Sequence, residues 1–125
     1  MIYMVPLPSQ PAPSPNDRTD RRATNTTVQA WREAAAWMAR KHRLPRMARA
    51  EIVLTMTPAD RRLRDATNLY AALKACEDGL VDAGVLRDDD WRYVAMTGCR
   101  IDTPDPDLAD HAWTLEIHDL SDDVA

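Results

Sequence analysis

The sequence has little cysteine and no long apolar run. Its two cysteines, Cys76 and Cys99, are too few for a disulfide framework, and neither has a Cys or His neighbour at zinc-finger spacing. No segment approaches the ~20 consecutive apolar residues of a membrane span. The first residues show neither a basic leader nor a small-residue cleavage site, and there is no internal repeat. We therefore expect a cytoplasmic protein, with no membrane association, whose two thiols are reduced and buried.

What the chain does contain is enough apolar material for one core. A length of 125 residues is typical of a single domain. Apolar residues make up 45% and charged residues 29%, which is the composition of a globular rather than a disordered chain. The sequence therefore predicts one domain over residues 1–125, held together by its own core.

The net charge of −4 conceals a strong asymmetry along the chain. Residues 18–64 contain 12 Lys and Arg against 4 Asp and Glu, whereas residues 65–125 contain 4 against 15. A basic half can follow a phosphate backbone. An acidic half can hold a divalent cation that bridges to the same phosphates. The alternative is that both halves are ordinary solvated faces.

Hydrophobic periodicity and turn residues predict the element order β-α-β-α-β-β. Strands are expected where β-branched and apolar residues cluster, and helices where apolar residues recur at every third or fourth position. Because two helices interleave with four strands, the expected fold class is α+β, a mixed α/β sheet with two helices packed on it. The expected strands are residues 2–7, 49–57, 91–101 and 111–118, and the expected helices are residues 26–42 and 66–83.

Two segments are expected to lack regular structure. Residues 8–25 carry four prolines among polar residues, which is typical of an extended loop, and residues 119–125 are expected to fray. Pro6 and Pro8 restrict the first strand to a sheet edge, because proline cannot donate a ladder hydrogen bond. Trp31 falls on the apolar stripe of the first helix and is expected in the core.

The second predicted helix has two distinct faces. Gly79 lies inside it, which indicates close packing against a neighbour, and Gly84 is a natural residue to end it. Thr67 begins an exposed line that continues through Lys74 and Asp78. At 100° per residue, the opposite face brings four apolar residues together as a core face: Leu69, Leu73, Cys76 and Leu80.

Acidic residues flank this helix at both ends. Asp65 precedes it, and the run from Asp88 to Asp90 follows it. Paired carboxylates suit Mg²⁺, which takes oxygen ligands, and a cation so held can support phosphodiester cleavage while Lys74 adds positive charge. The two groups can meet only if the chain returns along the helix or if a dimer partner supplies one of them. Alternatively, Asp65 is a helix N-cap and the acidic run is a solvated turn.

The run from Asp60 to Asp90 resembles the signature of the RusA-type Holliday junction resolvases of phages and prophages. That pattern is a basic turn, an Asp-x-Asp-Asn-Leu opening of a helix, a downstream Lys, an Asp-x-Leu step, an Ala-Gly pair and an Asp-Asp pair. Residues 16–18 and 30–32 also resemble the start of these proteins. The matching residues are Arg61, Arg62, Arg64, Asp65, Asn68, Leu69, Lys74, Asp78, Leu80, Ala83, Gly84, Asp88 and Asp89.

The resemblance implies a Mg²⁺-dependent endodeoxyribonuclease, with Mn²⁺ as an alternative cation, that acts on four-way or other branched DNA. It also implies a homodimer, because a two-fold junction needs two symmetric nicks. Asp65, Lys74 and Asp89 are the implied catalytic residues, with Lys74 stabilising charge at the scissile phosphate. The implied metal ligands are Asp65, Asp88 and Asp89, and the implied DNA contacts are Arg61, Arg62, Arg64 and Asn68.

One position departs from the family pattern. Thr67 stands where the family has the second Asp of Asp-x-Asp, a metal ligand. An un-ionised hydroxyl is a poor ligand for Mg²⁺, so metal binding is expected to weaken. Asp88 or Asp78 can substitute, or Thr67 can coordinate through its hydroxyl or a water. Otherwise the protein is a catalytically weak or inactive branched-DNA binding protein. A third alternative is an acidic protein-interaction module without a DNA role.

Overall fold

Four strands of mixed direction form the sheet in the computed structural model, which describes residues 1–13 and 21–123. The strand order is β1-β4-β2-β3, with β2 and β3 parallel and the other pairs antiparallel. The predicted α+β class and element order are confirmed. The elements are β1 Ile2–Leu7, α1 Arg21–Lys41, β2 Ala50–Thr57, the 3-10 helix η1 Ala66–Leu69, α2 Tyr70–Asp82, β3 Val94–Ile101, β4 Ala112–Asp119 and the 3-10 helix η2 Ser121–Asp123.

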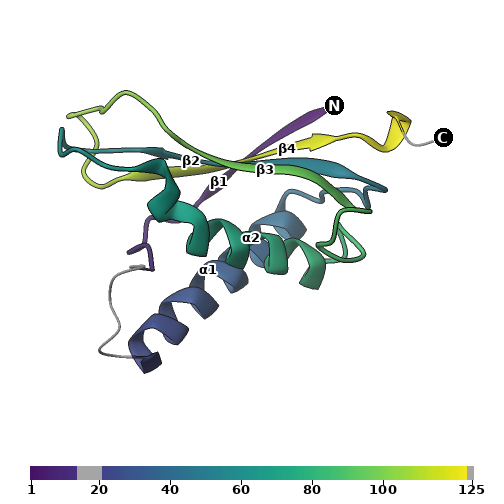
Figure 1. The fold of residues 1–125 in the computed structure, drawn as a ribbon. Helices are drawn as coiled ribbons and strands as arrows, with labels where there is room; N and C mark the ends of the chain where they lie inside the picture. The colour runs from purple at the N-terminus through teal and green to yellow at the C-terminus, as the bar shows by residue number, and fades with distance from the viewer. Residues whose placement is uncertain (14–20, 124–125) are drawn as a thin grey trace.

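Both helices lie on one face of the sheet, which gives the molecule two layers (Figure 1). The core lies between the layers. Ile52, Leu54 and Met56 of β2 belong to the core cluster, and Val53 and Thr55, which alternate with them, are also buried. Trp31 of α1 is fully buried, which confirms its predicted place, and its ring packs edge-on against Trp113 with centroids 4.7 Å apart.

The two helices pack closely at Gly79. A Cβ built on this glycine would lie 2.3 Å from the main-chain oxygen of Arg32 and 2.9 Å from Cβ of Ala35. The predicted close packing is therefore confirmed, and its partner is the backbone of α1. A bidentate ion pair between Arg32 and Asp82 closes the same interface, with its shorter contact at 2.6 Å.

The predicted core face of the second helix is also confirmed, since Leu69, Leu73, Cys76 and Leu80 are all buried. Both cysteines are free, although Cys99 is only partly buried. Burial raises the pKa of the Cys76 thiol to about 12, so this side chain acts as a core residue. No helix in residues 1–13 and 21–123 is both long and apolar enough to cross a membrane.

Two predicted boundaries were wrong. Helix α1 begins at Arg21, so residues 21–25 of the predicted loop are helical, while residues 14–20 lie outside the described part. Strand β3 begins at Val94 rather than Trp91, because the main-chain oxygen of Asp90 accepts hydrogen bonds from Tyr93 N–H and Val94 N–H and closes a turn.

The predicted frayed tail is likewise corrected. Leu120 donates its N–H to the Arg49 oxygen, and the Ser121 hydroxyl accepts from Ala48 N–H, so the chain stays attached to the segment before β2. These bonds satisfy backbone groups that a sequence pattern does not reveal. Residues 124–125 lie outside the described part.

Replacing Gly79 with Ala is expected to destabilise the protein, although Ala is intrinsically favoured in a helix by about 1 kcal/mol. The added methyl group collides with backbone that cannot move without separating the helices, so we expect a net loss of about 1–3 kcal/mol in urea unfolding. Gly98→Ala is the matched control, because its nearest neighbour is the Met96 sulfur at 3.8 Å. Equal stabilities for the two variants would contradict the close helix packing.

Candidate functional site

The β2-α2-β3 unit positions the predicted site residues. Asp65 follows the end of β2, whereas Asp88, Asp89 and Asp90 precede the start of β3. Because β2 and β3 are parallel neighbours, these two connections leave and enter the sheet at opposite ends. Thirteen residues of α2 separate them, a helix about 20 Å long. The fold therefore holds the two predicted acidic groups at different places.

The acidic turn is nevertheless in contact with the helix through Lys74. The Lys74 ammonium forms an ion pair with Asp89 and a second one with Asp78, whose Oδ1 lies 3.1 Å away. The Lys74 side chain is 57% exposed, and those of Asp78 and Asp89 are 31% and 27% exposed. Exposed pairs of this kind add little stability, so this contact contributes little to holding the fold. We call Lys74, Asp78 and Asp89 the lysine cluster.

Hydrogen bonds and an ion pair within the acidic turn fix its shape. Asp89 donates its N–H to the Asp88 carboxylate at 2.8 Å, and Arg92 pairs with Asp90 at 2.9 Å. The Arg92 guanidinium, which donates side-chain hydrogen bonds to Asp90, lowers the pKa of that carboxyl. Asp90 is thus occupied by Arg92, and Asp89 is the member of the turn that reaches Lys74.

Asp65 occupies the N-cap position of η1 but does not act as a cap. Its backbone is extended, with φ −103° and ψ 128°, and its side chain makes no capping hydrogen bond. The Asp65 main-chain oxygen instead accepts from Asn68 N–H at 3.1 Å. The N-cap alternative is therefore not realised, and the exposed carboxylate of Asp65 is available for other contacts. Thr67, on the same short helix, is also exposed.

The predicted metal ligands do not form a ready-made three-ligand site. Over residues 1–13 and 21–123, the structure contains no group of three His, Cys, Asp or Glu side chains placed to hold a metal ion. The structure does contain two carboxylates, those of Asp78 and Asp89, that form ion pairs with the same Lys74 ammonium. Mg²⁺ commonly takes one or two carboxylates together with substrate phosphates. Both carboxylates of the lysine cluster pair with the Lys74 ammonium, and no described contact joins Asp65 to them.

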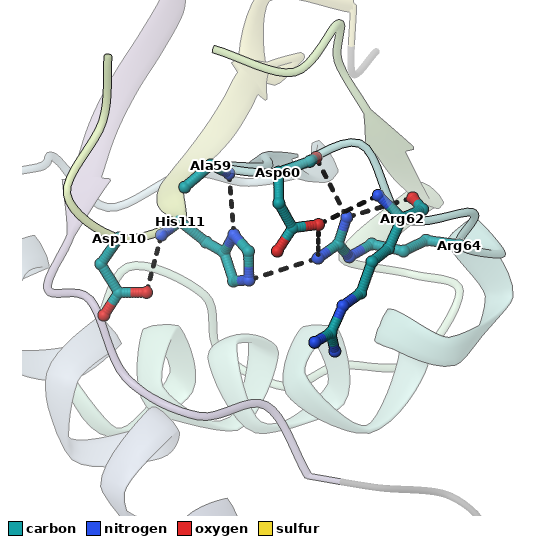
Figure 2. A network of polar contacts seen from close by, with 6 residues as sticks. All are labelled: Ala59, Asp60, Arg62, Arg64, Asp110 and His111. Carbon is teal, nitrogen blue, oxygen red and sulfur yellow. Dashed lines mark hydrogen bonds and ion pairs between the residues drawn. The ribbon is translucent and has the colours of Figure 1, made fainter. Parts of the chain in front are cut away.

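The predicted basic turn divides into two kinds of arginine. Arg61 and Arg62 are exposed, but the Arg64 side chain is only 18% exposed. Figure 2 shows Arg64 directed back at its own turn, where it donates to the Asp60 carboxylate at 2.7 Å and to the main-chain oxygens of Asp60 and Arg62. Arg64 therefore holds the turn in shape, and the two exposed arginines present charge to solvent.

His111 is a site residue that the sequence analysis missed. Its Nδ1 accepts a hydrogen bond from Ala59 N–H at 2.9 Å, and its Nε2 lies 3.5 Å from Nη2 of Arg64 (Figure 2). Together with Arg64, Asp65 and Asn68, it lines a pocket of about 390 Å³. No sequence spacing indicates this convergence, because the pocket joins residues 10–13, 56–69 and 101–113 only after the sheet has formed.

Comparisons with known proteins add no family assignment. A scan against protein-family models finds no match, and a search of curated proteins gives no significant match.

We expect Arg64→Gln to raise the pKa of Asp60 part of the way to its ordinary value. That pKa is lowered first by the Arg62 backbone N–H, which the variant keeps, and then by the Arg64 side chain, which it loses. A carboxyl with a lowered pKa stabilises the fold above its unfolded pKa, and this contribution disappears as the pH falls through the folded value. The stability deficit of the variant should therefore shrink in acid.

The measurement is an NMR titration of the Asp60 carboxyl, combined with unfolding at neutral and acidic pH. Arg61→Gln is the control, because Arg61 is exposed and does not contribute to the Asp60 shift. An Asp60 pKa that is the same in the parent and in Arg64→Gln would refute the role assigned to Arg64.

Proposed function

We propose that this protein is a structure-specific endodeoxyribonuclease that cleaves phosphodiester bonds of four-way or other branched DNA. The observation that carries the proposal is the ion pair between Lys74 and Asp89. These residues are 15 positions apart in the sequence, and the resemblance to RusA-type resolvases implies a catalytic role for each. Their contact on an exposed surface supports a shared active site there.

In this proposal, Mg²⁺ is the cofactor and Mn²⁺ an alternative. Asp89 is the central ligand, and Asp78 supplies the second carboxylate because it shares the Lys74 ammonium. Asp88 and Asp65 are still predicted to be ligands of the cation. Asp88 precedes Asp89 in the sequence, whereas Asp65 lies at the far end of α2. The cation would neutralise charge on the attacked phosphate, and Lys74 would add positive charge on the same face.

The DNA contacts of the proposal follow from the exposure of the basic turn. Arg61 and Arg62 are free to approach phosphates, and such contacts position a protein on DNA without reading its sequence. Arg64 and Asn68, which line the pocket, would act closer to the bases. A homodimer would present two such surfaces to a junction that has two-fold symmetry.

A second candidate is a branched-DNA binding protein with little or no cleavage. Two observations favour it. Thr67 is an exposed, neutral residue where the family pattern has an acid, and the described residues contain no three-ligand metal group. The basic turn would still bind phosphates in this case, because its charge does not depend on the acidic turn.

A paired assay on a synthetic four-way junction separates the two candidates. A gel shift without metal measures binding, and nicking in Mg²⁺ or Mn²⁺ measures cleavage. Binding together with metal-dependent nicking supports the nuclease, whereas binding without nicking supports the second candidate. Failure to bind junctions at any salt concentration would contradict both.

We predict that Asp89→Asn abolishes nicking and leaves junction binding within about twofold. The change keeps the shape of the side chain but removes a charged oxygen from the lysine cluster. Asp107→Asn is the matched control, because Asp107 is an exposed loop aspartate whose N–H bonds to Asp105. Nicking by Asp89→Asn at the parent rate would mean that the lysine cluster is not the active site.

We also predict that Thr67→Asp increases nicking, most visibly at low Mg²⁺ concentration. It adds a carboxylate to η1, two residues after Asp65 and at the end of α2 away from the lysine cluster, so an increase in nicking would show that the cation also contacts residues at this end. Thr103→Asp, in an exposed loop, controls for added negative charge. An inactive parent whose activity Thr67→Asp does not restore would favour the binding-only candidate. An active parent that this change does not affect would show that Thr67 is remote from the cation.

A further inference from the structure

The basic turn and the acidic turn lie at opposite ends of the β2–β3 pair. Arg61 and Arg62 follow the end of β2, whereas Asp89 precedes the start of β3, which runs parallel to β2. Since β2 has eight residues, about 26 Å separate the two ends. Phosphate contacts set the register of a protein on DNA. Contacts to the phosphates nearest the lysine cluster therefore have to come from other side chains.

Two exposed arginines line a hollow at the end of the sheet where the acidic turn lies. Arg46 belongs to the connection from α1 to β2, and Arg87 to the connection from α2 to β3. Figure 1 shows both connections at the same end of the sheet, and Met47 joins them by donating its N–H to the Val85 oxygen at 2.8 Å. The hollow measures about 480 Å³. We call this hollow, with Arg46 and Arg87 in its lining, the arginine hollow.

The backbone next to each arginine is anchored in the core. Met47 directly follows Arg46, Leu86 directly precedes Arg87, and both apolar residues are only 1% exposed. A fixed neighbour limits the positions that each guanidinium can reach. Such preorganisation lowers the entropy that is lost when a ligand is held between two side chains.

Neither guanidinium is occupied by the protein itself. Within residues 1–13 and 21–123, the side chains of Arg46 and Arg87 form no ion pair and no hydrogen bond. The carboxylates of Asp88 and Asp119, which lie within two residues of lining positions, accept hydrogen bonds from backbone N–H groups instead. Both arginines are therefore open to an anion from solution.

Helix electrostatics do not account for these two arginines. Arg40 and Lys41 occupy the last turn of α1, where the helix dipole stabilises basic residues. Arg46 and Arg87 lie outside the helices. Residues 42–49 contain three arginines and neither Asp nor Glu, although the chain as a whole has a net charge of −4. A local excess of positive charge on an acidic protein favours an anionic partner.

We propose that the arginine hollow binds a backbone phosphate of the DNA strand that is cleaved at the lysine cluster. This inference rests on the proposed function. A planar guanidinium can donate two parallel hydrogen bonds to phosphate oxygens, and two such groups line the hollow. Arg87 lies two residues before Asp89, and two residues of chain span at most about 7 Å. Because one DNA strand advances about 3.4 Å per nucleotide, the two phosphates are a few nucleotides apart. A free oxyanion offers the same chemistry, so the experiment has one arm for each source.

The first arm measures how junction binding depends on salt. We expect Arg46→Gln and Arg87→Gln each to reduce the slope of log affinity against log salt concentration by about 0.9, the effect of one lost phosphate contact. Arg22→Gln is the matched control, because Arg22 is exposed near the beginning of α1, about 30 Å from the end that leads to the hollow.

The outcomes of this arm separate the inference from the proposed function. A parent-like slope in both variants, with the junction still bound and nicked, would overturn the arginine hollow and leave the proposed nuclease standing. A reduced slope in both variants of a protein that nicks in neither Mg²⁺ nor Mn²⁺ would support the hollow as a DNA contact and refute the nuclease.

The second arm follows the guanidinium N–H signals of Arg46 and Arg87 by NMR in ¹⁵N-labelled protein. We expect a four-way junction to shift both signals at equimolar concentration, and inorganic phosphate to shift them only at a large excess, at matched ionic strength. Saturable shifts with inorganic phosphate, while the bound junction leaves both signals unchanged, would identify a free-oxyanion site and overturn the assignment to DNA. Signals that neither probe shifts would overturn the hollow as a phosphate site.

Discussion

The parallel pairing of β2 and β3 is the constraint on which the rest of the structure depends. A parallel pair needs a crossover, and α2 provides it across the face that α1 also covers (Figure 1). The approach of the two helices at Gly79 then fixes how α2 lies. Because the crossover runs the length of the sheet, the residues before α2 and those after it are held at opposite ends.

This separation divides the polar surface into two centres. At one end, Arg64, Asp65 and Asn68 join His111 around a pocket of about 390 Å³. Toward the other, Lys74 gathers the carboxylates of Asp78 and Asp89 on an exposed face. In the proposed function, the second centre is the reactive site. In our account, a DNA branch contacts both, with its phosphate at the lysine cluster.

The sequence predicts the parts of this protein that depend on local pattern. Helical periodicity predicted the buried face around Leu73 and Leu80, and the glycine inside the helix predicted close packing. The prolines predicted the edge position of β1 in the sheet. The start of β3 depends on hydrogen bonds within a turn, and the ordered tail depends on hydrogen bonds between segments, such as that from Leu120 to Arg49. Such bonds leave no periodic pattern in the sequence. The pocket was not foreseen because His111 and Gln10 approach Arg64 only through the sheet. Spacing also cannot show that Arg64 bonds to its own turn.

The most direct test of the central claim asks whether the contact between Lys74 and Asp89 is chemical or only structural. The double variant Lys74→Asp, Asp89→Lys exchanges the two charges and so keeps an ion pair between the helix and the acidic turn. Its junction-nicking rate in Mg²⁺ is compared with that of the parent, at matched folding and junction binding. Our account predicts that the parent nicks the junction and the exchanged variant does not, since the carboxylate and the ammonium have changed places around the phosphate. Nicking by the exchanged variant at the parent rate would contradict the account.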